Sequence, residues 1–137
     1  MSFFQAIESC LRKYAVFAGR APRSEFWFWQ LLQILVTGSL TVIEQGSSTT
    51  AAGPVLSIIA TLVSLAFVVP AVAVGARRLH DVDRSGWWQL AALTVVGVIP
   101  LLYWSCVRGT AGPNRFGPDP LAPATPAEKP RIRRPAA

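Results

Sequence analysis

The chain alternates short charged segments with long apolar runs. The runs cover residues 26–43, 54–76 and 87–107, and no Asp, Glu, Lys or Arg lies inside them. At 1.5 Å per residue, a helix of about 18 residues reaches roughly 27 Å, close to the 30 Å thickness of a bilayer core. We therefore predict an all-α membrane protein with three transmembrane helices. Residues 1–120 would form one multi-pass domain.

The N-terminal segment, residues 3–18, has helical periodicity with one polar face. Its charged side chains exclude a membrane span, so we predict an amphipathic helix that lies along the membrane interface and ends at Gly19. The apolar positions are Phe3, Phe4, Ile7, Leu11, Tyr14 and Ala18, and the polar ones are Gln5, Glu8, Ser9, Arg12 and Lys13.

All five tryptophans stand near the ends of the apolar runs. An indole ring prefers apolar contact while its N–H prefers water, so this placement predicts an aromatic belt at the membrane surfaces. The predicted belt consists of Trp27, Trp29, Trp87, Trp88 and Trp104.

The composition indicates what kind of partner to expect. The chain carries 13 Lys and Arg against 7 Asp and Glu, and these basic residues flank apolar runs. This arrangement favours contact with a bilayer and its anionic phospholipids over nucleic acid. Cys10 and Cys106 match no metal or redox spacing, and we expect no metal or cofactor. A second copy of the chain or another membrane protein is a further candidate partner.

The basic residues also predict orientation. With three spans, the N-terminal segment and the loop after residue 76 share one side, which carries Arg12, Lys13, Arg20, Arg23, Arg77, Arg78 and Arg84. Arg108 and Arg115 would lie opposite, so the positive-inside rule places the N-terminus in the cytoplasm. The alternative is a third run that re-enters at Gly97–Pro100, which would put every basic motif inside. Residues 121–137 read as a disordered basic Pro/Ala-rich tail with four further Lys or Arg.

Three motifs stand in a fixed order along the chain. They are Tyr14-x-x-Phe17-x-Gly19-Arg20-x-x-Arg23-Ser24-Glu25-Phe26-Trp27, then Arg77-Arg78-Leu79-His80-Asp81-x-x-Arg84-Ser85-Gly86-Trp87-Trp88, then Gly109-Thr110-x-Gly112-x-Asn114-Arg115-Phe116-Gly117-x-Asp119-Pro120. Together they resemble the DUF805 family of small bacterial inner-membrane proteins over about residues 8–121. The resemblance implies a multi-pass protein of the bacterial cytoplasmic membrane. It implies no activity, ligand or catalytic residue.

The charged motifs supply the candidate site residues. We predict that Glu25 pairs with an arginine of the 77–84 loop, since both lie at the same membrane surface. Unpaired arginines would contact lipid phosphates or a partner, although plain topogenic charge explains them as well. The predicted contact residues are Arg20, Arg23, Glu25, Arg77, Arg78, His80, Asp81, Arg84, Asn114 and Arg115.

Three classes of function fit these residues. A membrane interaction or accessory protein fits best, because the sequence offers no catalytic motif or phosphate-binding loop. An oligomeric transporter or channel subunit is an alternative, with Gln30, Gln33 and Gln89 as polar groups in the runs. The third is a membrane enzyme acting on lipid headgroups through His80 and Asp81. We expect the chain not to be an enzyme.

Overall fold

A computed structural model describes residues 1–122, and all regular elements within that range are helical. The prediction of an all-α protein is therefore confirmed for this part of the chain. The tail predicted to be disordered lies, from residue 123 onward, outside the described residues. The helices are α1 (Phe3–Arg12), α2 (Arg23–Ser47), α3 (Gly53–Asp81), the 3-10 helix η1 (Gly86–Leu93) and α4 (Val95–Cys106).

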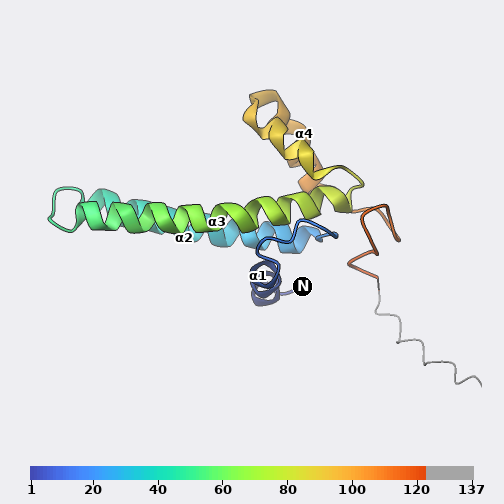
Figure 1. Cartoon of the computed structure of the whole chain (residues 1–137), viewed down its shortest axis with the longest axis horizontal. Coiled ribbons are helices and arrows are strands. Elements are labelled where there is room, and N and C mark those ends of the chain that lie inside the picture. Colours follow the sequence, from blue (N-terminus) through green and yellow to red (C-terminus); the bar gives the residue numbers. More distant parts are fainter. Residues whose placement is uncertain (123–137) are drawn as a thin grey trace, which may run out of the picture.

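Helices α2 and α3 form a long antiparallel hairpin that is the axis of the molecule (Figure 1). Within residues 1–122 they are the two helices long and apolar enough to cross a membrane. Each contains one of the first two predicted runs and extends beyond it, so the charged residues Glu25, Arg77 and Arg78 lie on helix ends. Trp29 stacks on Phe67 between the two helices, with ring centroids 5.3 Å apart.

Helix α3 continues through Pro70 because a side chain compensates for the missing backbone donor. Proline has no N–H, so the carbonyl of Ala66, four residues earlier, loses its partner within the helix. The hydroxyl of Tyr14 donates to this carbonyl. A residue of the first sequence motif thereby replaces a backbone hydrogen bond that the second apolar run lacks.

The prediction of one continuous helix over 87–107 is wrong. The run divides at Thr94, whose extended backbone separates η1 from α4 and whose hydroxyl caps α4 by accepting from Gly97 N (3.1 Å). The chain then turns back, and rings from its two ends, Trp88 and Trp104, meet with centroids 5.4 Å apart. A Cβ on Gly97 would lie 2.0 Å from the carbonyl oxygen of Ala91, so this turn requires glycine. Three membrane-crossing helices are therefore not confirmed.

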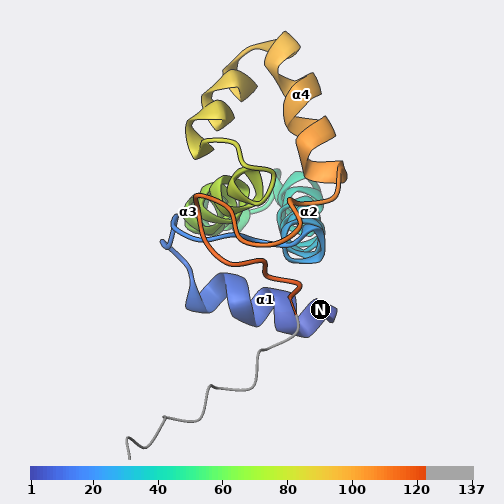
Figure 2. The ribbon, with the colours of Figure 1, turned by 90° about the vertical axis from the view of Figure 1, so that its right-hand side faces the viewer.

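Helix α1 is shorter than predicted and lies against the long hairpin. It ends at Arg12 rather than at Gly19, because the carbonyls of the following turn are bonded to α3 instead of to the next helical residues. Its small residues Ala6 and Cys10 are buried, whereas Phe4 is 81% exposed. Viewed along the α2–α3 axis, α1 lies on one side of the long hairpin and η1–α4 on the other (Figure 2).

Candidate functional site

The charged residues of the first two motifs meet inside the protein. Because α2 and α3 are antiparallel, the first turn of α2 lies beside the last turns of α3, and the segment before α2 adds a further guanidinium. We call this group the buried ion cluster. It consists of Arg20, Glu25, Arg77, Arg78 and Asp81, whose exposed fractions lie between 1% and 7%.

The first half of the buried ion cluster joins α1 to the long hairpin. Arg77 Nη2 donates to Glu25 Oε1 (3.0 Å), and Ser9 Oγ donates to the same oxygen (3.2 Å). Arg77 Nη1 donates to the carbonyls of Lys13 (3.3 Å) and Val16 (3.1 Å). The predicted pairing of Glu25 with an arginine of the 77–84 loop is confirmed, and Arg77 is the partner.

The second half joins α3 to the segment after α4. Asp81 accepts from two guanidiniums, Arg20 Nε (2.9 Å) and Arg78 Nη1. Arg20 also donates to the carbonyls of Thr110 and Gly112, the latter at 2.6 Å. One carboxylate thus holds two arginines, and one of these arginines holds the third sequence motif.

The third motif folds closely over the end of α3. A Cβ at Gly109 would lie 2.0 Å from Asp81 Oδ2, so this approach requires glycine. Asn114 Nδ2 donates to the carbonyl of His80 (2.8 Å), and Asn114 Oδ1 accepts from Phe116 N (2.9 Å). The Phe116 ring then stacks on the imidazole of His80, with centroids 3.9 Å apart.

Side chains of α2 and α3 also satisfy the end of α4. The last carbonyls of a helix have no partner within it, and burying them unpaired in apolar surroundings is costly. Donors from the long hairpin meet four of these carbonyls in succession. The bonds are Trp27 Nε1 to Ser105 O (3.2 Å), Arg23 Nη1 to Cys106 O (3.1 Å), Arg78 Nη2 to Trp104 O (3.0 Å), and Arg78 Nη2 to Val107 O.

The buried ion cluster contains three guanidiniums and two carboxylates, so one positive charge is not paired by a carboxylate. Backbone carbonyls from the three surrounding segments accept Nη–H groups of all three guanidiniums. Among the described residues, Nε of Arg77 and Nε of Arg78 are buried without a partner. Because removing one partner would leave a buried charge uncompensated, the cluster favours this single arrangement of segments. These residues hold the segments together, although the sequence predicted that they contact lipid.

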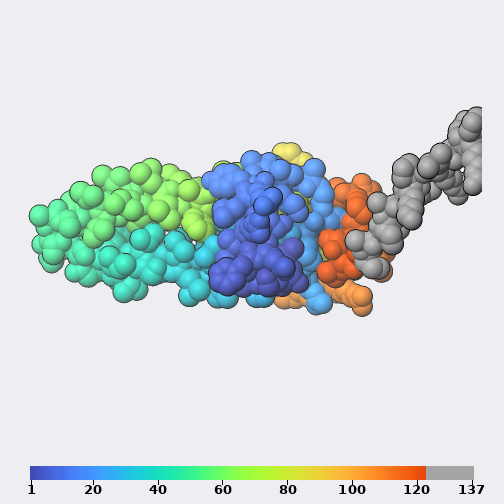
Figure 3. Space-filling view, turned by 90° about the horizontal axis from the view of Figure 1, so that it is seen from below, coloured from blue at the N-terminus to red at the C-terminus, as the bar shows by residue number. Residues whose placement is uncertain are grey.

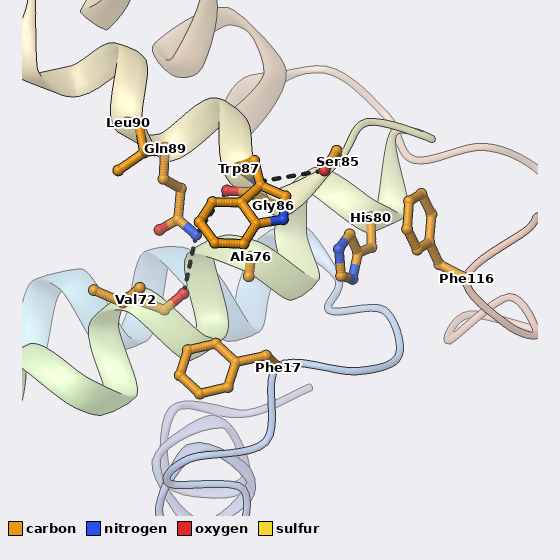
Figure 4. Close-up of a pocket in the computed structure, with 10 residues that line it drawn as sticks. All are labelled: Phe17, Val72, Ala76, His80, Ser85, Gly86, Trp87, Gln89, Leu90 and Phe116. Carbon is orange, nitrogen blue, oxygen red and sulfur yellow. Dashed lines mark hydrogen bonds between the residues drawn. The ribbon is translucent and has the colours of Figure 1, made fainter.

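Beside the cluster, a cavity of about 540 Å³ lies between α3 and η1 (Figure 4). Gln89 Nε2 donates to the carbonyl of Val72 (3.2 Å) and so joins the two helices across it. A second cavity of about 470 Å³ between the long hairpin and η1–α4 shares Val72, Gln89 and Leu90 with the first. The first cavity is lined by Phe17, Val72, Ala76, His80, Ser85, Gly86, Trp87, Gln89, Leu90 and Phe116.

His80 stands at the polar end of this cavity. Its Nδ1 lies 3.1 Å from the carbonyl of Gly19, which requires a proton on Nδ1 and leaves Nε2 of the neutral ring as an acceptor. The neighbouring Asp81 forms ion pairs with Arg20 and Arg78. His80 and Asp81 therefore do not form the pair that the enzyme alternative considered.

The structure divides the ten predicted contact residues into two groups. The five members of the buried ion cluster face one another, which corrects their prediction as lipid or partner contacts, because their side chains are enclosed by protein. Lipid or partner contact remains a prediction for the others. Arg23, Arg84 and Arg115 are exposed, whereas His80 and Asn114 are half-buried.

One tryptophan of the predicted belt is misplaced. Trp29 is 1% exposed and forms part of the protein core with Cys10, Ala21 and Val74. It lies nearly two helical turns inside α2, on the face that packs against α3. Trp87 and Trp88 are exposed, and the belt remains a prediction for the four tryptophans other than Trp29.

The sequence did not predict the contacts of three further residues, because these residues carry no charge. Ser9 and Cys10 contact Glu25, and Tyr14 contacts Ala66. Burial, reinforced by the neighbouring Glu25 carboxylate, raises the pKa of the Cys10 thiol to about 12. The polar-face pattern placed Ser9 on the outer side of α1, and no sequence signal pairs it with α2.

This fold and the buried ion cluster define a small helical membrane protein in which charged residues of the first two motifs are buried inside the protein. The chain belongs to the family described as "Protein of unknown function (DUF805)", which it matches over residues 14–118. This confirms the resemblance seen in the three motifs.

Two curated relatives come from Escherichia coli strain K12. Inner membrane protein YhaH is 40% identical over 111 residues, which are 80% of this chain and 91% of the relative. Inner membrane protein YhaI is 39% identical over 113 residues, which are 82% of this chain and 92% of the relative. No solved structure matches the chain.

Proposed function

We propose that this protein is an accessory protein of the bacterial inner membrane that crosses the bilayer twice and binds a lipid chain beside the buried ion cluster. The location is supported by the names of YhaH and YhaI as inner membrane proteins and by the two long apolar helices. The proposal assigns the arginine motifs a structural role and moves lipid contact to the neighbouring cavity.

Two crossings fit the fold better than three. Since η1–α4 turns back at Thr94, the segment after α4 returns to the end of α3, where Thr110 N donates to the carbonyl of Asp81 (2.8 Å). The proposed topology therefore places η1–α4 as a re-entrant hairpin. It also places the N-terminus and residues 107–122 on one side of the membrane and residues 48–52 on the other.

The distribution of charge supports this topology. Residues 24–76 contain no Lys or Arg, so the side that presents residues 48–52 has none. The positive-inside rule then assigns the other side to the cytoplasm. That side carries Arg12, Lys13, Arg20, Arg23, Arg77, Arg78, Arg84, Arg108 and Arg115.

The observation that carries the binding proposal is the cavity of about 540 Å³ between α3 and η1, a volume typical of small-molecule sites. Its lining is apolar apart from His80 and Ser85 at one end and Gln89 at the other (Figure 4). In the proposed topology it opens among acyl chains close to the headgroups. We assign it to one chain of a phospholipid whose headgroup lies near Arg84 and Arg115, which flank the lining residues Ser85 and Phe116 in sequence.

Lipid retention tests the proposal. The full-length protein would be extracted with a native-lipid polymer, exchanged into mild detergent, and analysed by native mass spectrometry for bound phospholipid. We expect the wild type to retain one phospholipid and Val72→Trp, which fills the cavity, to lose it. Ile58→Trp, on an exposed position of α3 away from the cavity, is the matched control and should retain it. Equal retention by wild type and Val72→Trp would refute the assignment.

A further inference from the structure

We infer that this protein acts as a wedge that favours curved membrane, with the leaflet next to the buried ion cluster on the convex side. The inference rests on the two-crossing topology proposed above. It follows from where the structure places its mass, its apolar surface and its bonds.

The two ends of the molecule differ greatly in width. At the end beside the buried ion cluster lie α1, the segment before α2, η1–α4 and residues 107–122 (Figure 1). At the other end are the tips of α2 and α3 and the turn that joins them. Seen from below, the part crossed by α1 is only slightly wider than the end at residues 40–60 (Figure 3), so the difference lies mainly in the direction along which α1 and η1–α4 flank the long hairpin (Figure 2). In a bilayer, one leaflet would hold far more protein than the other.

The surface of the broad end is suited to lipid rather than water. The tip of η1–α4 presents Leu93, Val95 and Val96, and Val95 is 89% exposed. On the opposite side of the long hairpin, α1 presents Phe4 and Leu11. Apolar side chains exposed to this extent favour transfer into the acyl layer. Both elements would therefore occupy area inside the leaflet, as interfacial helices that respond to curvature do.

The buried ion cluster makes this shape rigid. Arg77 bonds the turn after α1, and Arg78 bonds the last carbonyls of α4, so both flanking elements are held to adjacent residues of α3. Neither can swing away from the long hairpin without exposing a buried guanidinium. A fixed shape that is broad in one leaflet expands that leaflet, and the bilayer relaxes by curving so that the expanded leaflet lies on the convex side.

Orientation in vesicles of different size tests this inference. Full-length Cys10→Ser protein would be reconstituted into phosphatidylcholine–phosphatidylglycerol vesicles prepared either small by sonication or large by extrusion. A membrane-impermeant maleimide would then report how much of the exposed Cys106 faces outward. We expect a roughly twofold excess of outward over inward Cys106 in small vesicles and equal amounts in large ones, since the outer leaflet of a small vesicle is convex.

Matched variants assign the effect to the wedge. Leu93→Asn with Val95→Asn removes apolar surface from the broad end and should abolish the size dependence. Val55→Asn with Ile58→Asn removes similar surface from the narrow end and should preserve it. The same outward fraction in small and large vesicles for the wild type would overturn the inference.

The design separates this inference from the proposed topology. A parallel preparation carries Ser48→Cys in a chain that also has Cys10→Ser and Cys106→Ser. If residues 48 and 106 face opposite sides while vesicle size has no effect, the wedge fails and the two-crossing topology stands. If both residues label in the same proportion at each size and respond together, the proposed topology itself fails.

Discussion

Glu25 links α1 to α3 through a single oxygen atom. Its Oε1 accepts from Ser9 Oγ at 3.2 Å and Arg77 Nη2 at 3.0 Å, and Cys10 Sγ lies 3.8 Å away. All of these donors come from other elements. Loss of the charge would therefore leave Arg77 buried without its carboxylate.

We predict that Glu25→Gln destabilises the folded protein by about 3–5 kcal/mol, the cost of breaking a buried ion pair. Unfolding in mixed micelles with increasing dodecyl sulfate would measure it. Glu8→Gln is the control, because the Glu8–Arg12 pair on α1 is exposed and such pairs contribute little. Equal effects of the two substitutions would show that the Glu25 pair is not buried in the folded state.

The two cysteines should differ sharply in reactivity. Cys10 is buried with a pKa raised to about 12, so almost no thiolate exists near pH 8, whereas Cys106 is exposed. We predict that N-ethylmaleimide modifies Cys106 alone in the folded protein, from neutral pH up to the pH at which the protein unfolds. Mass spectrometry of peptides would identify the site. Modification of Cys10 at a rate near that of Cys106 would contradict the packing of α1.

At this scale the sequence predicted the residues of the site better than their roles. The pairing of Glu25 followed from its position at a helix start, on the same surface as the arginines. The burial of Arg20, Arg78 and Asp81 did not, because it depends on the carbonyls of segments more than twenty residues away. Charge alone does not distinguish a guanidinium that faces lipid phosphate from one that faces a backbone carbonyl.

Among the elements, α3 depends on a side chain of another segment to complete its backbone hydrogen bonds near Pro70. Tyr14 donates to the carbonyl that Pro70 leaves free. We predict that Tyr14→Phe costs about 1–2 kcal/mol, since in the proposed topology the carbonyl of Ala66 would be left unpaired in the apolar layer of the membrane. In a Pro70→Ala background the residue-70 N–H takes over that carbonyl, and Tyr14→Phe should cost much less. Additive effects in this double-mutant cycle would exclude the proposed coupling.

The turn of η1–α4 gives a second prediction for an element. As one straight helix, residues 88 and 104 would be separated by about 24 Å, whereas in the hairpin their rings are in contact. In a chain with Cys10→Ser and Cys106→Ser, we predict that Trp88→Cys and Trp104→Cys are joined by a short bismaleimide within one molecule. Trp88→Cys with Val55→Cys is the negative control. Failure of the first pair to cross-link would support the continuous helix.

Hydropathy predicted α2 and α3 because a long apolar run between charged segments fits a spanning helix. It failed for the third run because a helical hairpin and a single span bury the same apolar residues in lipid. The difference lies in Thr94, which caps a new helix, and in Gly97, which allows the close turn. The alternative of a re-entrant third run placed the turn at Gly97–Pro100, a few residues after Thr94.

The molecule as a whole is asymmetric across the membrane in both charge and shape. Residues 24–76 carry no Lys or Arg, and the broad end gathers the three sequence motifs around the end of α3. The return of the chain at Thr94 determines this asymmetry, because it decides on which side residues 107–122 lie. The proposals on lipid binding, membrane curvature and orientation all depend on this turn of the chain.

The most direct test is therefore the sidedness of Cys106 in cells. Spheroplasts expressing Cys10→Ser protein would be treated with a membrane-impermeant maleimide before and after permeabilisation, in parallel with a chain in which Ser48→Cys is the sole cysteine. We predict that residue 48 labels in intact spheroplasts and that Cys106 labels only after permeabilisation. Labelling of both residue 48 and Cys106 in intact spheroplasts would mean that the third run crosses the membrane, and it would contradict the account.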